Sequence, residues 1–157
     1  MDVAARRVFD GVLTVENGVV SSIAPSSDVD ADAPYFLPGF IDSHVHIESS
    51  MMVPAEFARV AVEQGTIGVV ADPHEIGNVL GKEGIEFMIE SGKNIRFNFC
   101  FGAPSCVPSC SADIETSGAA LGSNDVDELL ARDDIGYLAE MMNFPGVLAG
   151  DKEVMAK

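Results

Sequence analysis

Two histidines one residue apart, His44 and His46, carry the clearest chemical signal in this 157-residue sequence. They follow the short apolar run 36–41, which is typical of a β-strand. Side chains two apart on a strand share a face and lie about 6–7 Å apart at Cα, so both imidazoles can reach one metal ion. Paired histidines also occur by chance on exposed strands. Because these are two of only three histidines, and Asp42 could orient one of them, we expect a metal site here.

The third histidine lies in the sequence Asp72-Pro73-His74-Glu75, directly after the β-type run 66–71. Two carboxylates and an imidazole at one place could bind a substrate, transfer protons or hold a further metal. The alternative is an ordinary helix start, where acidic side chains accept hydrogen bonds from free N–H groups. A histidine has no capping role in that position. We therefore favour catalytic roles for Asp72, His74 and Glu75.

A single glutamate, Glu140, ends the apolar run 135–139. A carboxylate at the end of a strand can bridge two cations and help to hold a hydroxide between them. Taken alone, the position fits a solvated strand end better. The family resemblance described below is what makes Glu140 a candidate for both metal binding and catalysis.

Strand patterns and helix patterns alternate from residue 36 onwards. Expected strands include 66–71, 95–101 and 135–139, and a polar loop is expected over 102–122. A first helix starts near Pro54 and stops at Gly65, and a second carries Ile85, Met88 and Ile89 and ends at Gly92. A third helix carries Val126, Leu129 and Leu130 after an N-cap at Ser123 or Asn124. Repeated strand–helix units predict a parallel α/β sheet, and the candidate residues all follow strands. Such positions suit a (β/α)8 barrel or a doubly wound sheet, but no Gly-x-Gly-x-x-Gly loop supports the latter. The barrel is favoured.

The sequence predicts two regions. Residues 1–35 form a small β segment, in which runs 12–15 and 19–23 are joined through Asn17-Gly18, a strong hairpin signal. Residues 36–157 form about the first four β/α units of a barrel that needs about 250 residues when complete. Four strands leave two open edges. We therefore expect a homo-oligomer, or a missing C-terminal half, to complete the fold.

The composition limits the classes of molecule that the chain could bind. Acidic residues number 25 and basic residues 9, which gives a net charge of −16. Such a surface repels nucleic acids and anionic membranes, and it favours solubility at high salt, which makes a halophilic source a hypothesis. No apolar run approaches the ~18 residues of a membrane span, and no signal peptide is recognisable, so a cytoplasmic protein is expected. Three cysteines, Cys100, Cys106 and Cys110, are expected to be reduced and structural or incidental.

Four segments together resemble the adenine deaminase branch of the amidohydrolase superfamily. They are 38–51, 72–76, 105–108 and 138–147, in the order and at the spacing of that branch. The extension Ile47-Glu48-Ser49-Ser50-Met51 is specific to it. The resemblance covers the chain from about Asp10 to its last residue. This stretch corresponds to the N-terminal portion of the family's proteins only.

The resemblance implies a hydrolytic deaminase that converts adenine and water to hypoxanthine and ammonia with a metal-bound hydroxide. It implies a binuclear centre, most simply of Mn2+, with Fe2+ or Zn2+ as alternatives. His44 and His46 would bind one metal and Glu140 would bridge both. Asp72, His74 and Glu75 would lie near the adenine pocket.

One restriction on activity and two alternative functions remain open. The family's further histidine ligands and its catalytic aspartate come from later strands, so this chain alone is expected to be inactive. A second reading keeps the superfamily but changes the substrate to that of a dihydroorotase-like or imidazolonepropionase-like enzyme. A third is a non-catalytic half-barrel remnant. The extension at Glu48-Ser49-Ser50-Met51 argues against a changed substrate.

Overall fold

The computed structural model describes residues 1–111 and 113–157. The chain divides into two compact units, Met1–Gly39 and Phe40–Lys157. The second unit contains all of the residues for which sequence analysis predicted chemistry. The two units are therefore described separately.

The first unit is built on a two-stranded antiparallel hairpin of β1 (Gly11–Glu16) and β2 (Val19–Pro25). Its turn residues Asn17 and Gly18 have φ values of 53° and 76°. Positive φ at both positions is what a tight two-residue hairpin turn requires, and Asn-Gly adopts it at low cost. The predicted hairpin is confirmed.

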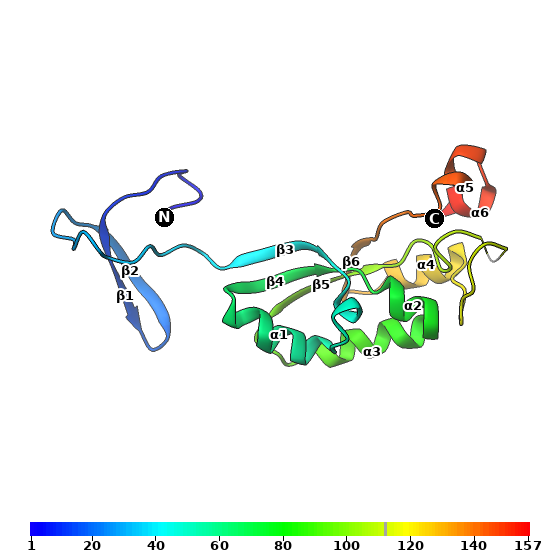
Figure 1. Cartoon of the computed structure of the whole chain (residues 1–157), viewed down its shortest axis with the longest axis horizontal. Coiled ribbons are helices and arrows are strands. Elements are labelled where there is room, and N and C mark those ends of the chain that lie inside the picture. The colour runs from blue at the N-terminus through cyan, green and yellow to red at the C-terminus, as the bar shows by residue number, and fades with distance from the viewer. Residues whose placement is uncertain (112) are drawn as a thin grey trace. The chain divides into compact units, whose positions relative to one another are not determined.

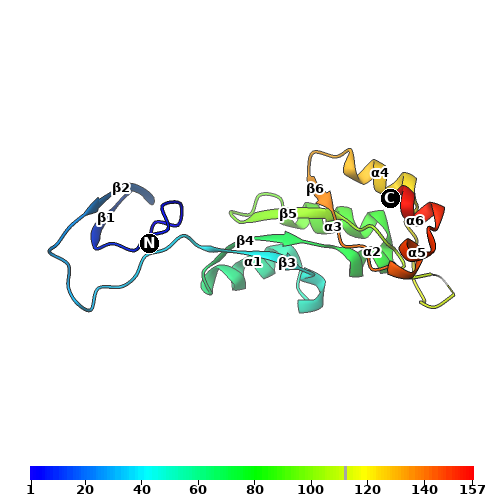
Figure 2. The same ribbon diagram turned by 90° about the horizontal axis from the view of Figure 1, so that it is seen from above.

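The second unit is built on a four-stranded parallel sheet, which Figures 1 and 2 show from two directions. Its strands are β3 (Phe40–Val45), β4 (Thr66–Ala71), β5 (Asn98–Ala103) and β6 (Ile135–Leu138). Their order in the sheet is β3-β4-β5-β6, the same as their order in the chain. This confirms a parallel α/β fold after a small β segment, and the topology is consistent with part of a (β/α)8 barrel.

Short and medium helices connect the strands. They are the 3-10 turn η1 (Ile47–Ser50) and the helices α1 (Pro54–Glu63), α2 (His74–Leu80), α3 (Lys82–Gly92), α4 (Ser123–Leu130), α5 (Phe144–Ala149) and α6 (Lys152–Ala156). Helices α1 and α3 lie along one face of the sheet, as Figure 1 shows. Among the described helices, none combines the length and the apolar character that crossing a bilayer requires.

The hydrophobic core lies between the sheet and these helices. Ile85, Met88 and Ile89 of α3 are buried there, as the helical spacing in the sequence predicted. They pack with β-strand residues such as Val69 and Phe101. In the described residues, Figure 1 shows no helix over the opposite face of the sheet, and β3 is exposed over most of its length.

Some element boundaries differ from the sequence prediction. The helical region after Asp72 is split at Gly81, whose φ of 63° and ψ of −141° interrupt the helix and separate α2 from α3. The N-cap of α4 is Gly122 instead of Ser123 or Asn124, because the Asp125 carboxylate accepts the Gly122 N–H at 2.9 Å. A helix was expected over 151–157, where α6 lies, whereas α5 was not predicted.

Strand β5 is also shifted toward the C-terminus. It starts at Asn98 and continues through Gly102 and Ala103, which the sequence prediction placed in a polar loop. Glycine usually indicates a loop, but Gly102 is buried because the Tyr137 ring packs on its α-carbon. A Cβ atom at Gly102 would lie 2.6 Å from Tyr137 Cζ. The glycine here is required by packing and not by a turn.

Candidate metal centre

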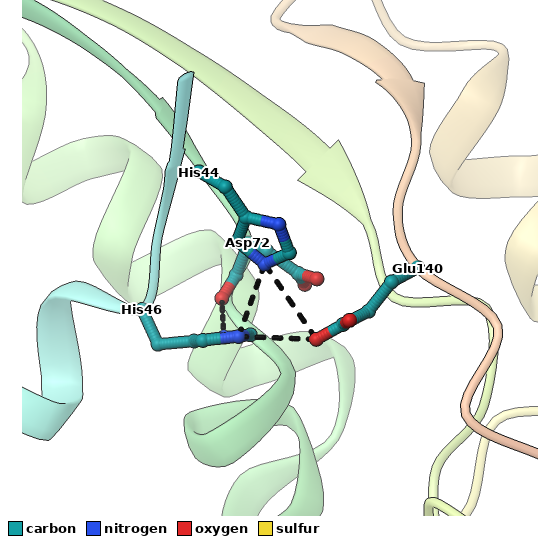
Figure 3. Close-up of side chains that lie close together, drawn as sticks. All are labelled: His44, His46, Asp72 and Glu140. Carbon is teal, nitrogen blue, oxygen red and sulfur yellow. Dashed lines mark hydrogen bonds and ion pairs between the residues drawn. The ribbon is translucent and has the colours of Figure 1, made fainter. Parts of the chain in front are cut away.

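Four potential metal ligands converge at the carboxyl ends of the strands, as Figure 3 shows. His44 lies on β3 and His46 directly follows it, Asp72 follows β4, and Glu140 lies two residues beyond β6. Each offers one ligand atom, and these four atoms all lie within 4.8 Å of one another. Parallel strands place their carboxyl ends at one edge, which explains how residues 96 positions apart meet.

The two histidines and the glutamate form the tightest part of the cluster. Glu140 Oε1 lies 3.2 Å from His46 Nε2 and 3.6 Å from His44 Nε2, and the two Nε2 atoms are 3.3 Å apart. All three atoms therefore point at one small volume (Figure 3). Imidazole nitrogen with carboxylate oxygen is a donor set that suits divalent transition metals.

The backbone fixes the orientation of His46. Its Nδ1 lies 2.7 Å from the carbonyl oxygen of Asp72, an acceptor, so Nδ1 carries the proton and donates it. The lone pair is then on Nε2, which faces His44 and Glu140. A histidine ligand is commonly oriented by such a hydrogen bond from its other nitrogen. The carboxylate of Asp42 accepts the backbone N–H of His44 at 3.0 Å and so shapes the strand end, whereas its expected contact was with an imidazole.

Asp72 supplies the most direct indication that a cation fits. Its side chain is 1% exposed, and its Oδ1 accepts a hydrogen bond from His74 Nδ1. Its Oδ2 is buried and has no hydrogen-bond partner in the described residues. A buried carboxylate oxygen without a donor is costly, and a bound cation would satisfy it. The sequence predicted Asp72 as a catalytic residue near the pocket, but it did not predict Asp72 as a metal ligand.

His74 and Glu75 lie next to the cluster but outside it. His74 is buried, and although burial lowers its pKa, hydrogen bonds to Asp72 and Cys106 raise the pKa to about 9. It is therefore a charged partner for Asp72. Glu75 is exposed and accepts the Ser49 hydroxyl at 2.5 Å. The predicted group Asp72, His74 and Glu75 is thus divided between a ligand position, a buried partner and an exposed carboxylate.

Two residues that sequence reasoning gave no chemical role lie within hydrogen-bond distance of this network. Ser105 and Cys106 follow β5 and are both buried. Burial raises the pKa of the Cys106 thiol, but hydrogen bonds to His74 and Ser105 outweigh burial and lower it. Both belong to the segment 105–108 that the family resemblance included, directly after a strand, but no individual role was predicted for either residue.

A parallel α/β sheet with a histidine–carboxylate cluster at its carboxyl edge is an arrangement that suits a metal-dependent hydrolase, and the family comparison is consistent with it. The model of the Amidohydrolase family matches residues 35–156. The chain belongs to the amidohydrolase family. Proteins of this family typically use a metal, and the His44, His46, Asp72 and Glu140 cluster could hold one.

Three relatives of known name narrow the class further. The chain is 54% identical to adenine deaminase from Methanosarcina mazei, 52% to that from Salinibacter ruber and 47% to that from Borreliella burgdorferi. Each match covers the whole of this chain but 28% of the relative's length. The chain therefore spans little more than a quarter of the proteins it resembles.

Proposed function

We propose that this chain provides one part of the active site of a hydrolytic adenine deaminase. The observation that carries the proposal is the convergence of His44, His46, Asp72 and Glu140 at one sheet edge. The names of relatives about 50% identical over the whole chain supply the substrate, adenine. In this proposal, residues 36–157 form about the first four units of a (β/α)8 barrel, and residues 1–35 belong to a small β domain.

The metal centre is proposed to be binuclear and to contain Mn2+. His44 and His46 would bind one cation, and Glu140 would bridge it to a second. The unpartnered Asp72 Oδ2 supports an added role for Asp72 as a ligand. A divalent cation lowers the pKa of water and stabilises negative charge that develops on a substrate.

The chain's own residues would then orient ligands and move protons. Hydrogen bonding to the Asp72 carbonyl keeps the His46 Nε2 lone pair directed into the centre. The buried His74 holds Asp72 Oδ1, which leaves Oδ2 free to face a cation. Glu75 is an exposed carboxylate three residues after Asp72, and its Ser49 contact fixes it, which suits a group that carries a proton toward departing ammonia.

Completion of the site requires further strands. Strand β6 is the last strand of the described sheet, so its outer edge is free to pair. The relatives are more than three times as long as this chain, which leaves room for the rest of a barrel. A second copy of the chain is the other candidate for covering this edge.

The proposal is tested by exchanging segments. A chimera in which this chain replaces the matching segment of the Methanosarcina mazei relative is expected to release ammonia from adenine in the presence of Mn2+. The same chimera with His44→Ala and His46→Ala should be inactive and serves as the matched control. A chimera that folds and binds Mn2+ but leaves adenine unchanged would overturn the substrate assignment. Dihydroorotate and imidazolonepropionate, assayed in parallel, distinguish the other cyclic-amide hydrolases.

A further inference from the structure

Glu140 lies outside the region that strand pairing can hold. Strand β6 ends at Leu138, and the following backbone contact to β5 runs from Ala139 N to Ala103 O at 2.9 Å. Glu140 comes one residue later, and its carboxylate is 40% exposed. Its contacts with His44 and His46 therefore depend on whatever fixes the backbone just beyond the strand.

Two buried side chains make that attachment. The Ser105 side chain is fully buried, and its hydroxyl donates a hydrogen bond to the backbone carbonyl of Glu140. The Cys106 Sγ accepts the backbone N–H of Met142 at 3.1 Å and lies 3.7 Å from the same Glu140 carbonyl. The peptide groups on both sides of Met141 are thus held by neighbouring residues of one loop.

The same pair is connected to the histidine side of the cluster. Cys106 Sγ lies 3.6 Å from His74 Nε2, and His74 Nδ1 is hydrogen-bonded to Asp72. The Asp72 carbonyl in turn accepts from His46. A continuous set of buried and partly buried polar contacts therefore runs from the backbone of Glu140 to the ring of His46.

We infer that Ser105 and Cys106 are positioning residues for the metal centre, which hold Glu140 at the distance from His44 and His46 that a shared cation requires. The inference rests on the proposed function. Neither side chain has to touch the metal, because both act through the backbone of residues 140–142. Residues that orient metal ligands without touching the metal typically contribute about 10–100-fold to metal affinity.

Mn2+ titration of the 157-residue chain tests the inference. Ser105→Ala and Cys106→Ala are each expected to weaken Mn2+ binding by about 10-fold or more. Cys106→Ser keeps a small acceptor for the Met142 N–H and should restore part of the affinity. Cys110→Ala and Ser111→Ala change the same residue types nearby in the same loop and should bind Mn2+ like the parent chain.

A double-mutant cycle separates positioning from a general loss of structure. If Ser105 acts through Glu140, then Ser105→Ala should cost little further affinity in a chain that already carries Glu140→Ala. An equal loss in both backgrounds would overturn the inference. The same holds if Ser105→Ala and Cys106→Ala bind Mn2+ as tightly as the parent.

A metal-free measurement keeps the test independent of the proposed function. NMR cross-peaks between the Glu140 side chain and the His46 ring are expected in the parent chain and in Cys110→Ala. They should weaken or vanish in Ser105→Ala, and unchanged cross-peaks would refute the positioning role. If the parent itself binds no Mn2+, the proposed metal centre is wrong for this chain, while the cross-peaks still decide whether Ser105 places Glu140.

Discussion

The ring of His46 donates a hydrogen bond from Nδ1 to the backbone carbonyl of Asp72, over 2.7 Å. This contact joins the end of β3 to the segment that follows β4, and it fixes which nitrogen of His46 can bind a metal. Because the acceptor is a backbone atom, no substitution at Asp72 removes it directly. The orientation of His46 is thus a property of the fold, and the side chains around it complete the centre.

Loss of a histidine should abolish the stabilisation that a metal gives. At a Mn2+ concentration 100 times its Kd, the parent chain should gain about 2.7 kcal/mol, because the metal binds only the folded state. His46→Ala should remove this gain, and EDTA should remove it from the parent. Thermal unfolding with and without Mn2+ measures both. A parent chain whose Tm is the same with and without Mn2+ would contradict the proposed metal centre.

Removal of His74 should destabilise the metal-free chain strongly. Asp72 is 1% exposed and His74 4%, so His74→Ala leaves a buried carboxylate without its partner. Such a loss typically costs about 3–5 kcal/mol. Urea unfolding of the two chains gives the difference directly.

The matched control is the partly exposed ion pair of Arg132 and Glu86, at 3.1 Å. Glu86→Ala should cost less than about 1 kcal/mol. Equal costs for the two substitutions would show that the buried pair contributes no more than a surface pair.

Gly102→Ala should be destabilising although Gly102 lies in a strand. The added Cβ would meet Tyr137 Cζ at 2.6 Å, and overpacking of this kind costs about 1–3 kcal/mol. Chemical denaturation measures the change. Tyr137→Leu removes the ring, so the double variant should recover much of the loss. If Gly102→Ala is neutral, the Tyr137 ring must move freely.

High salt should stabilise the chain. With 25 acidic and 9 basic residues, self-repulsion opposes the compact state, and at about 1 M salt the Debye length falls to about 3 Å. The Tm is therefore expected to rise between low and molar KCl. A Tm that stays constant or falls over this range would argue against both strong self-repulsion and a halophilic origin.

Local patterns predicted most of the elements. The Asn17-Gly18 turn, the helix that begins at Pro54 and the strand at Thr66–Ala71 each depend on nearby residues, and all three are present. The strand position of Gly102 depends on a residue distant in sequence, which no local pattern contains. Gly102 looks like a loop residue until Tyr137 is placed against it.

The candidate site divides in the same way. His44 and His46 could be proposed from their spacing at a strand end, and Glu140 from a strand-end position combined with the family resemblance. The structure brings the three together. Asp72 was proposed for catalysis, and its unpartnered oxygen became visible only when burial was known. Ser105 and Cys106 act through backbone atoms of Glu140 and Met142, contacts that side-chain chemistry alone does not reveal.

His46 and Glu140 lie just beyond the ends of β3 and β6, the two edge strands of the sheet, and are separated by 94 positions in the chain. A cation held between them would act as a cross-link that encloses every strand and helix in between. The conformational entropy lost in closing a loop grows only with the logarithm of the loop length. Most of that entropy is already lost when β3 and β6 join one sheet, before a metal binds. Metal binding would therefore act late, by tying together two borders that the fold has already brought near.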